Sequence, residues 1–145
     1  MSDLLQVGPE VIEPAALLAA VEDPSCGAVA CFLGRVRSPN AGVEVRYLEY
    51  EGYVALALKT LSDIAAEQRL LHGHSRWAMQ HRLGRLTPGE ISLAVIVATP
   101  SRKAAFSACE EAVEQCKGRL PVWKLEVTSS GSHFVPGSST AASTI

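Results

Sequence analysis

The sequence predicts a single α+β domain in which helices pack on a largely antiparallel sheet. The chain has 145 residues, and 48% of them are hydrophobic. That length suits one domain, which can bury about 70% of its unfolded surface. Strand-like and helix-like apolar patterns alternate in the order β-α-β-β-α-β-β-α-β, without internal repeats. We expect the domain to cover residues 1–128. Residues 129–145 are uncharged and rich in Ser, Thr, Gly and Ala, and are expected to form a loosely ordered tail.

The first part of the chain shows three strand patterns and one short helix. Residues 4–7 form a short apolar strand pattern. Pro14 opens a helix that runs to Val21, since proline is tolerated in the first turn. Residues 27–36 are apolar almost throughout, which is typical of a strand buried on both faces. Residues 38–42 have turn composition and predict a mobile loop, and residues 43–50 alternate as a further strand.

The second part predicts two longer helices and three strands. Apolar positions at helical spacing indicate an amphipathic helix over residues 54–71. A Thr-Pro-Gly-Glu turn joins the strands expected over residues 75–83 and 91–99. Gly118 is expected to end the second helix as a left-handed cap. The expected helices are 54–71 and 100–117, and the expected strands are 75–83, 91–99 and 122–128.

Charge and hydropathy exclude several classes of protein. Lys and Arg number 13 against 15 Asp and Glu, for a net charge of −2. A general nucleic-acid binder normally carries a clear basic excess. The sequence holds no apolar run of the ~18–20 residues that a membrane span requires. It begins without a secretory signal pattern, so a cytoplasmic protein is expected.

The cysteines and histidines give no metal-binding spacing. Cys109 and Cys116 lie two helical turns apart, in register with Phe106 and Val113, which indicates a buried core stripe. No CxxC pair exists, and no carboxylate closely flanks the His-Gly-His at residues 72–74. His81 beside Arg82 forms a polar pair at a strand end, for which a structural role is the better interpretation.

Positive charge is local, because three of the four lysines lie between residues 103 and 124. Arg102 and Lys103 fall in the first turn of a predicted helix, where the helix dipole disfavours cations unless an anion is bound. The alternatives are an anion site or two solvated side chains. Lys124 lies mid-strand beside Trp123, where lysine is unusual. If Lys117 converges on Lys124, each lowers the pKa of the other, and such lysines serve as proton donors, bases or nucleophiles.

Two arginines stand at the exit of the strand predicted over residues 27–36. Arg35 and Arg37 flank Val36 and lead into the flexible loop. Guanidinium groups at a strand exit suit phosphate recognition.

Five segments together resemble a known family. They are GAVACFLGRVR, LEYEGY, HRLGRLTPGE, ATPSRKAAF and KGRLPVWKLE. In this order and spacing they resemble the large, catalytic subunit of molybdopterin synthase (the MoaE family), over roughly residues 10–128. The most specific element is a lysine followed, six residues later, by Trp-Lys-x-Glu.

The resemblance implies a fold, a reaction and partners. The implied fold is an α/β hammerhead-like domain with an additional antiparallel β subdomain. The implied assembly is a central homodimer that binds two copies of a small ubiquitin-like sulfur carrier subunit, giving a heterotetramer. The implied reaction moves sulfur from the carrier's C-terminal thiocarboxylate to cyclic pyranopterin monophosphate, and two transfers create the molybdopterin dithiolene. No metal or other cofactor is implied on this chain.

The resemblance also implies roles for individual residues. Lys117 matches the lysine beside the carrier's C-terminal glycine, and Lys124 matches a second essential lysine that acts in proton transfer or charge stabilisation. Glu126 matches the acidic residue that follows it. The positions that match contacts to the anionic pterin are Arg35, Val36, Arg37 and Arg102.

Some positions depart from the family pattern. Ser101 replaces the usual histidine, Leu125 replaces a basic residue, and residues 132–138 lack the arginine that the family's tail contributes to the partner subunit. These departures leave open a non-catalytic dimeric module that binds an anionic metabolite, or a degenerate homologue. Lys117 and Lys124 favour the enzyme, because a pure anion binder does not need two lysines at this spacing.

Overall fold

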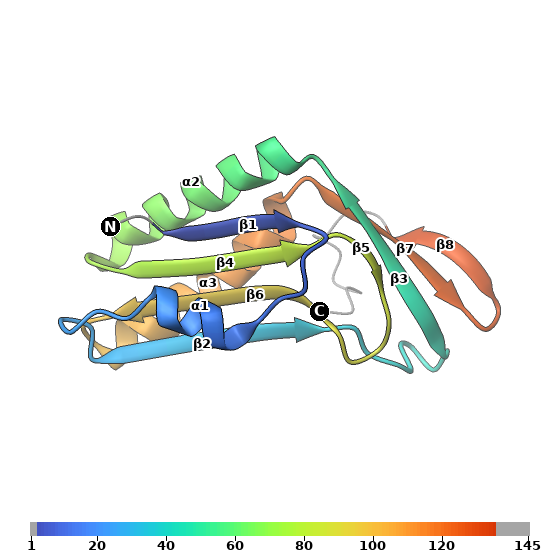
Figure 1. Cartoon of the computed structure of the whole chain (residues 1–145), viewed down its shortest axis with the longest axis horizontal. Coiled ribbons are helices and arrows are strands. Elements are labelled where there is room, and N and C mark those ends of the chain that lie inside the picture. Colours follow the sequence, from blue (N-terminus) through green and yellow to red (C-terminus); the bar gives the residue numbers. More distant parts are fainter. Residues whose placement is uncertain (1–2, 136–145) are drawn as a thin grey trace.

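The computed structural model describes residues 3–135, which form two β-sheets and three helices (Figure 1). The predicted α+β class is confirmed. The predicted element order is also confirmed, with two short strands in addition. Among residues 3–135, no helix is long and apolar enough to cross a membrane.

The first sheet has the strand order β1-β4-β6-β2. β1 pairs with β4 in parallel, and the other two pairings are antiparallel. Every residue from Ser92 to Thr99 in β6 is buried, since this strand lies inside the sheet with helices over both faces. The strand bounds are β1 Leu4–Gly8, β2 Ala28–Arg35, β4 Arg76–Arg82 and β6 Ile91–Thr99.

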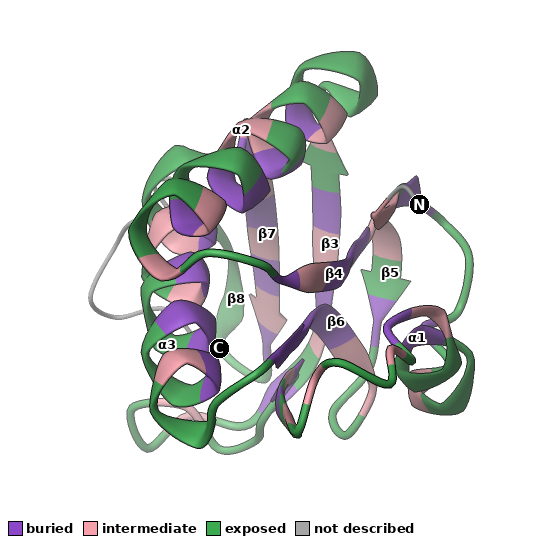
Figure 2. Ribbon diagram, turned by 90° about the vertical axis from the view of Figure 1, so that its left-hand side faces the viewer, coloured by how far each residue is buried: buried purple, intermediate pink, exposed green. Residues whose placement is uncertain are grey.

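The three helices lie on opposite sides of this sheet. α1 (Pro14–Ala20) covers one face, and α2 (Val54–His72) and α3 (Arg102–Arg119) lie side by side over the other (Figure 2). α2 turns Leu61 and Ile64 into the main core, where both are fully buried. Complete burial of such a side chain contributes about 1.5–3 kcal/mol.

The second sheet has the order β5-β3-β7-β8, is antiparallel throughout, and lies at one end of the first (Figure 1). It corresponds to the additional antiparallel subdomain that the family resemblance implies. Its strands are β3 Val45–Gly52, β5 Gly84–Leu86, β7 Val122–Thr128 and β8 Gly131–Val135. β8 falls within the predicted loose tail, so the regular fold extends past residue 128. Residues 136–145 of that tail lie outside the described residues.

Three details of the sequence prediction were wrong. β2 is an edge strand with Val29 and Cys31 exposed, rather than a strand buried on both faces. Gly118 lies inside α3, which ends at Arg119 with Leu120 as an extended cap. Phe106 is 67% exposed and does not join the core stripe that buries Cys109 and Cys116.

Candidate functional site

The inward face of β7 carries two charged side chains. Lys124 is 3% exposed and Glu126 is 5% exposed, while Trp123 and Leu125 on the other face are half-buried. The alternation predicted from the sequence is therefore confirmed. Lys124 and Glu126 lie on the buried face of β7. Buried charges are retained in proteins where they are paired or functional.

Lys124 lies in a buried setting that favours the neutral amine. Its Nζ is 5.9 Å from the centre of the Tyr50 ring, on the strand paired with β7. The pKa of Lys124 is lowered from 10.5 to about 8, mainly by burial; Glu126 opposes the shift, and the positive charges of Lys117 and Arg37 add to it. An amine with this pKa can exchange protons near neutral pH.

Lys117 and Arg37 reach this site from other elements. Lys117 is half-buried in the last turn of α3, and Arg37 follows the exit of β2. Their effect on the pKa of Lys124 indicates that the three cations share one electrostatic environment. The sequence-based expectation that Lys117 converges on Lys124 agrees with this effect.

Glu126 is held by a short polar network. Its Oε2 accepts a hydrogen bond from Asn40 Nδ2 at 3.2 Å, and its Oε1 lies 3.6 Å from His133 Nε2. Asn40 Oδ1 in turn accepts from Arg37 Nη2 at 3.2 Å. The network connects the loop after β2 to the middle of β7, so Arg37 is oriented by a chain of contacts that ends at Glu126.

Val36 has a different place from its two arginine neighbours. Its side chain is in the core, its N–H donates to the Glu90 carbonyl at 2.9 Å, and its carbonyl accepts from the Gly89 N–H at 2.7 Å. Arg35 and Arg37 are exposed on either side. Val36 therefore fixes the strand exit from which the two guanidinium groups extend.

Tyr50 and His81 were not predicted as parts of the site. Their rings meet edge to face with centroids 5.0 Å apart. His81 Nδ1 lies 2.9 Å from the Arg82 carbonyl, and burial lowers the pKa of His81 to about 4, with a smaller contribution from Lys124. The imidazole is thus neutral at physiological pH. The only sequence signal was the polar His81–Arg82 pair at a strand end.

A hollow of ≈ 450 Å³ opens beside Glu126. Its volume falls within the range of small-molecule sites, about 300–1,000 Å³. The residues that line it include Asn40, Ala41, Val43, Glu126, His133 and Phe134.

Arg102 lies at the other end of the molecule. Ala28 pairs with Thr99, and Arg35 pairs with Ile91, so the turn into α3 adjoins the start of β2 rather than its exit. The 8 residues of β2 separate these two ends by about 23 Å. One chain therefore does not bring Arg102 together with Arg35 and Lys124.

Ser101, where the family pattern has histidine, is the N-cap of α3. Its Oγ accepts a hydrogen bond from the Ala104 N–H at 3.4 Å, and Arg102 and Lys103 beside it are exposed. Serine is a preferred residue at this position because it satisfies a backbone donor that the helix leaves unpaired. The departure from the family pattern thus has a local structural role.

The sequence and fold were compared with known proteins. The "MoaE protein" family matches residues 7–119. A molybdopterin synthase catalytic subunit from Pyrococcus abyssi is 38% identical over 120 residues, covering 83% of this chain and 81% of that protein. One from Coccidioides immitis is 40% identical over 115 residues, or 79% of this chain. The chain spans only 59% of that fungal relative's length.

A solved structure supports the same relationship. The crystal structure of molybdopterin synthase from Staphylococcus aureus superposes with a TM-score of 0.86 and 33% identity, covering 89% of this chain and 94% of that one. The family match includes the strand exit at Arg35 and the helix that carries Lys117. The chain belongs to the MoaE protein family.

Proposed function

We propose that this chain is a molybdopterin synthase catalytic subunit. It would accept sulfur from the thiocarboxylate of a small ubiquitin-like carrier and transfer it to cyclic pyranopterin monophosphate, giving the dithiolene of molybdopterin. The names of its relatives support this assignment. The observation that carries it is Lys124, a buried lysine whose pKa is lowered to about 8 beside two further cations.

The charges fit the proposed reactants. Both the thiocarboxylate and the cyclic phosphate are anions, and Arg37 and Lys117 supply positive charge around Lys124. Arginine suits the phosphate because its planar fork can bind two oxygens together. Lys117 would hold the carrier's terminal carboxyl group.

Lys124 would act in the transfer itself. In each transfer the thiocarboxylate sulfur forms a bond to a pterin carbon as a C–O bond of the pterin breaks. Hydrolysis of the resulting thioester by water then leaves the sulfur on the pterin and a carboxylate on the carrier. Charge develops on oxygen and sulfur as these bonds change. An amine with a pKa of about 8 can stabilise that charge as the ammonium and exchange a proton with it.

The proposed active assembly is a homodimer within a heterotetramer with two carriers. The position of Arg102 supports the homodimer, because Arg102 and Arg35 of one chain lie at opposite ends of β2, which is about 23 Å long. A second copy of the chain could present its Arg102, and the start of its α3, to the substrate. The anion site expected at the start of α3 would then belong to the neighbouring subunit's pocket.

The direct test is formation of the dithiolene product from purified components. The protein is mixed with thiocarboxylated carrier and cyclic pyranopterin monophosphate, and product is quantified over time. Lys124→Ala is expected to abolish product while leaving the fold and carrier binding intact. Lys59→Ala is a matched control, because Lys59 is exposed and pairs only with Asp63 at 2.9 Å among the described residues.

The outcomes separate the proposed function from its alternatives. Product from the wild-type chain and from Lys59→Ala, but not from Lys124→Ala, supports the enzyme. Binding of the cyclic pterin without product from wild type would instead indicate a binding module or a degenerate homologue. Full activity of Lys124→Ala would remove Lys124 from the mechanism.

A further inference from the structure

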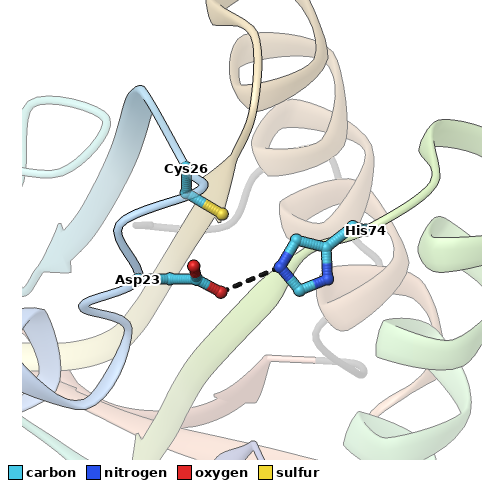
Figure 3. A group of neighbouring side chains, drawn as sticks. All are labelled: Asp23, Cys26 and His74. Carbon is cyan, nitrogen blue, oxygen red and sulfur yellow. Dashed lines mark hydrogen bonds and ion pairs between the residues drawn. The ribbon is translucent and has the colours of Figure 1, made fainter.

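Three potential metal ligands converge at the end of the first sheet away from Lys124. Asp23 and Cys26 lie between α1 and β2, and His74 lies just before β4 (Figure 3). One donor atom from each, a carboxylate oxygen, a thiol sulfur and an imidazole nitrogen, lies within 4.8 Å of the others. The sequence showed no carboxylate close to His74, because Asp23 is 51 residues away along the chain. Folding supplies it.

The turn around Asp23 orients its carboxylate. Oδ1 accepts hydrogen bonds from the Ser25 N–H at 2.9 Å and the Ser25 hydroxyl at 2.6 Å. The Cys26 N–H donates to the Asp23 carbonyl at 2.9 Å and closes the turn. Oδ2 is directed to His74 Nε2 at 2.8 Å. The hydrogen bonds from Ser25 and His74 hold the pKa of Asp23 well below its usual range, so the carboxylate is ionised.

The two arginine side chains next to the cluster have other partners. The Arg76 guanidinium donates to the carbonyls of Ala20 at 2.9 Å and Glu22 at 3.2 Å. Arg69 pairs with Asp3 at 2.8 Å. Burial and the Asp23 carboxylate raise the pKa of the Cys26 thiol, and Arg76 opposes this shift. The thiol gives up its proton to bind a metal. A divalent cation would neutralise the thiolate and the carboxylate together.

We propose that Asp23, Cys26 and His74 form a binding site for a zinc-like divalent cation, with the fourth tetrahedral position open to water. Zinc takes sulfur at about 2.3 Å and nitrogen or oxygen at about 2.0–2.1 Å. These bond lengths place tetrahedral donors about 3.3–3.6 Å apart. To bind zinc, the imidazole nitrogen and the carboxylate oxygen need to move apart by about half an ångström. The Cys26 sulfur needs to move closer to both, which a rotation of its side chain can provide.

The site is separate from the one around Lys124. His74 precedes β4, whereas His81 stands at the opposite end of that strand, 7 residues in length. A bound cation would connect the segment before β2 to the segment before β4, and would reinforce the His74–Asp23 pair and the hydrogen bonds of Arg76 at this end of the sheet. Metal binding would therefore stabilise the folded state without entering the sulfur transfer.

The test uses the full chain, stripped of metal with a chelator and titrated with Co²⁺ and then Zn²⁺. Bound Co²⁺ is expected to show a thiolate-to-cobalt charge-transfer band at one equivalent, and Zn²⁺ to displace it and raise Tm. Cys26→Ser and His74→Gln should lose the band and weaken binding by more than about 100-fold, since changes to groups outside the ligand shell already cost about 10–100-fold.

Two matched variants control for other thiols and imidazoles. Cys31→Ser removes an exposed cysteine, and His72→Gln removes the histidine two residues before His74. Both should bind Co²⁺ as wild type does. The proposal is overturned if the wild-type chain shows no charge-transfer band, or if Cys26→Ser retains it. Thermal unfolding without metal verifies that each variant folds.

Discussion

Tyr50 and Lys124 occupy paired positions on β3 and β7, with the lysine ammonium 5.9 Å from the centre of the tyrosine ring. The ring covers an amine that the strand holds out of solvent. Such a contact stabilises the ammonium through the face of the ring, but it replaces water that would stabilise it more. Burial is the largest cause of the lowered pKa of Lys124, which is about 8.

The pKa of Lys124 should shift in opposite directions when its neighbours Arg37 and Glu126 are neutralised. Arg37→Gln removes a positive charge and is expected to raise the pKa, whereas Glu126→Gln removes a negative charge and is expected to lower it. The shifts can be measured by NMR titration of isotope-labelled lysine side chains, because the chain has only four lysines. Lys59 is the internal reference. Shifts of the same sign in both variants would contradict this electrostatic account.

His81 should make the protein sensitive to acid. Its pKa is about 4 in the folded state against 6.5 in the unfolded state, so the unfolded state binds more protons between these values. Stability is complete above pH 6.5 and falls as pH drops towards 4, by up to about 3 kcal/mol.

Urea unfolding at several pH values measures this loss. His81→Gln is expected to flatten the dependence of the unfolding free energy between pH 6.5 and 4, while His72→Gln leaves it unchanged. A wild-type curve that is flat over this range would show that His81 is not held neutral by burial.

The placement of Arg102 predicts complementation between subunits. If a site combines Lys124 of one chain with Arg102 of the other, a hybrid of Lys124→Ala and Arg102→Ala chains contains one intact site and one doubly altered site. Random mixing should then restore roughly one quarter of wild-type activity, since half the dimers are hybrids with one working site. Each variant alone should be inactive or strongly impaired.

The experiment requires refolding or co-expressing the two variants with distinguishable tags. Activity of the isolated hybrid at about half the wild-type value would assign Arg102 to the neighbouring site. A hybrid no more active than its impaired parents would show that Lys124 and Arg102 of the same chain act in one site, and would contradict the shared site.

Ser101 is expected to contribute to stability through its helix cap. Ser101→Ala should lower the unfolding free energy by about 1 kcal/mol or less, given the 3.4 Å hydrogen bond, whereas Ser101→Asn should retain most of it. Denaturant unfolding at neutral pH measures both. Equal stability of Ser101→Ala and wild type would show that water satisfies the Ala104 N–H as well as the Ser101 hydroxyl does.

Sequence periodicity was sufficient for the order of the main elements, because strand and helix spacing are local properties. It did not distinguish an edge strand from a central one, since β2 and β6 are both apolar runs and only their position in the sheet differs. The strand β8 was missed because Gly131–Val135 is short, largely exposed and without a regular apolar alternation. Its pairing with β7 depends on a partner rather than on its own composition.

The site was predictable in part for similar reasons. Lys124 was recognisable because burying a lysine within an apolar strand costs free energy, so a lysine at such a position indicates a functional role. Tyr50 and His81 required the pairing of strands that are distant in sequence. Arg102 was grouped with Arg35 because the family resemblance matched both to contacts with the pterin, and the pairing of β2 with β6 places them at opposite ends of β2.

Val36 gives the two arginines beside it a fixed reference. Because its N–H and carbonyl are both bonded to the Gly89–Glu90 turn, the peptide there cannot rotate without breaking two main-chain hydrogen bonds. The backbone positions from which the two arginine side chains start are thus set by a turn that contributes no side chain to them. An insertion of one residue in that turn would break this anchoring and shift the strand exit that carries both side chains, while leaving both arginines in the sequence.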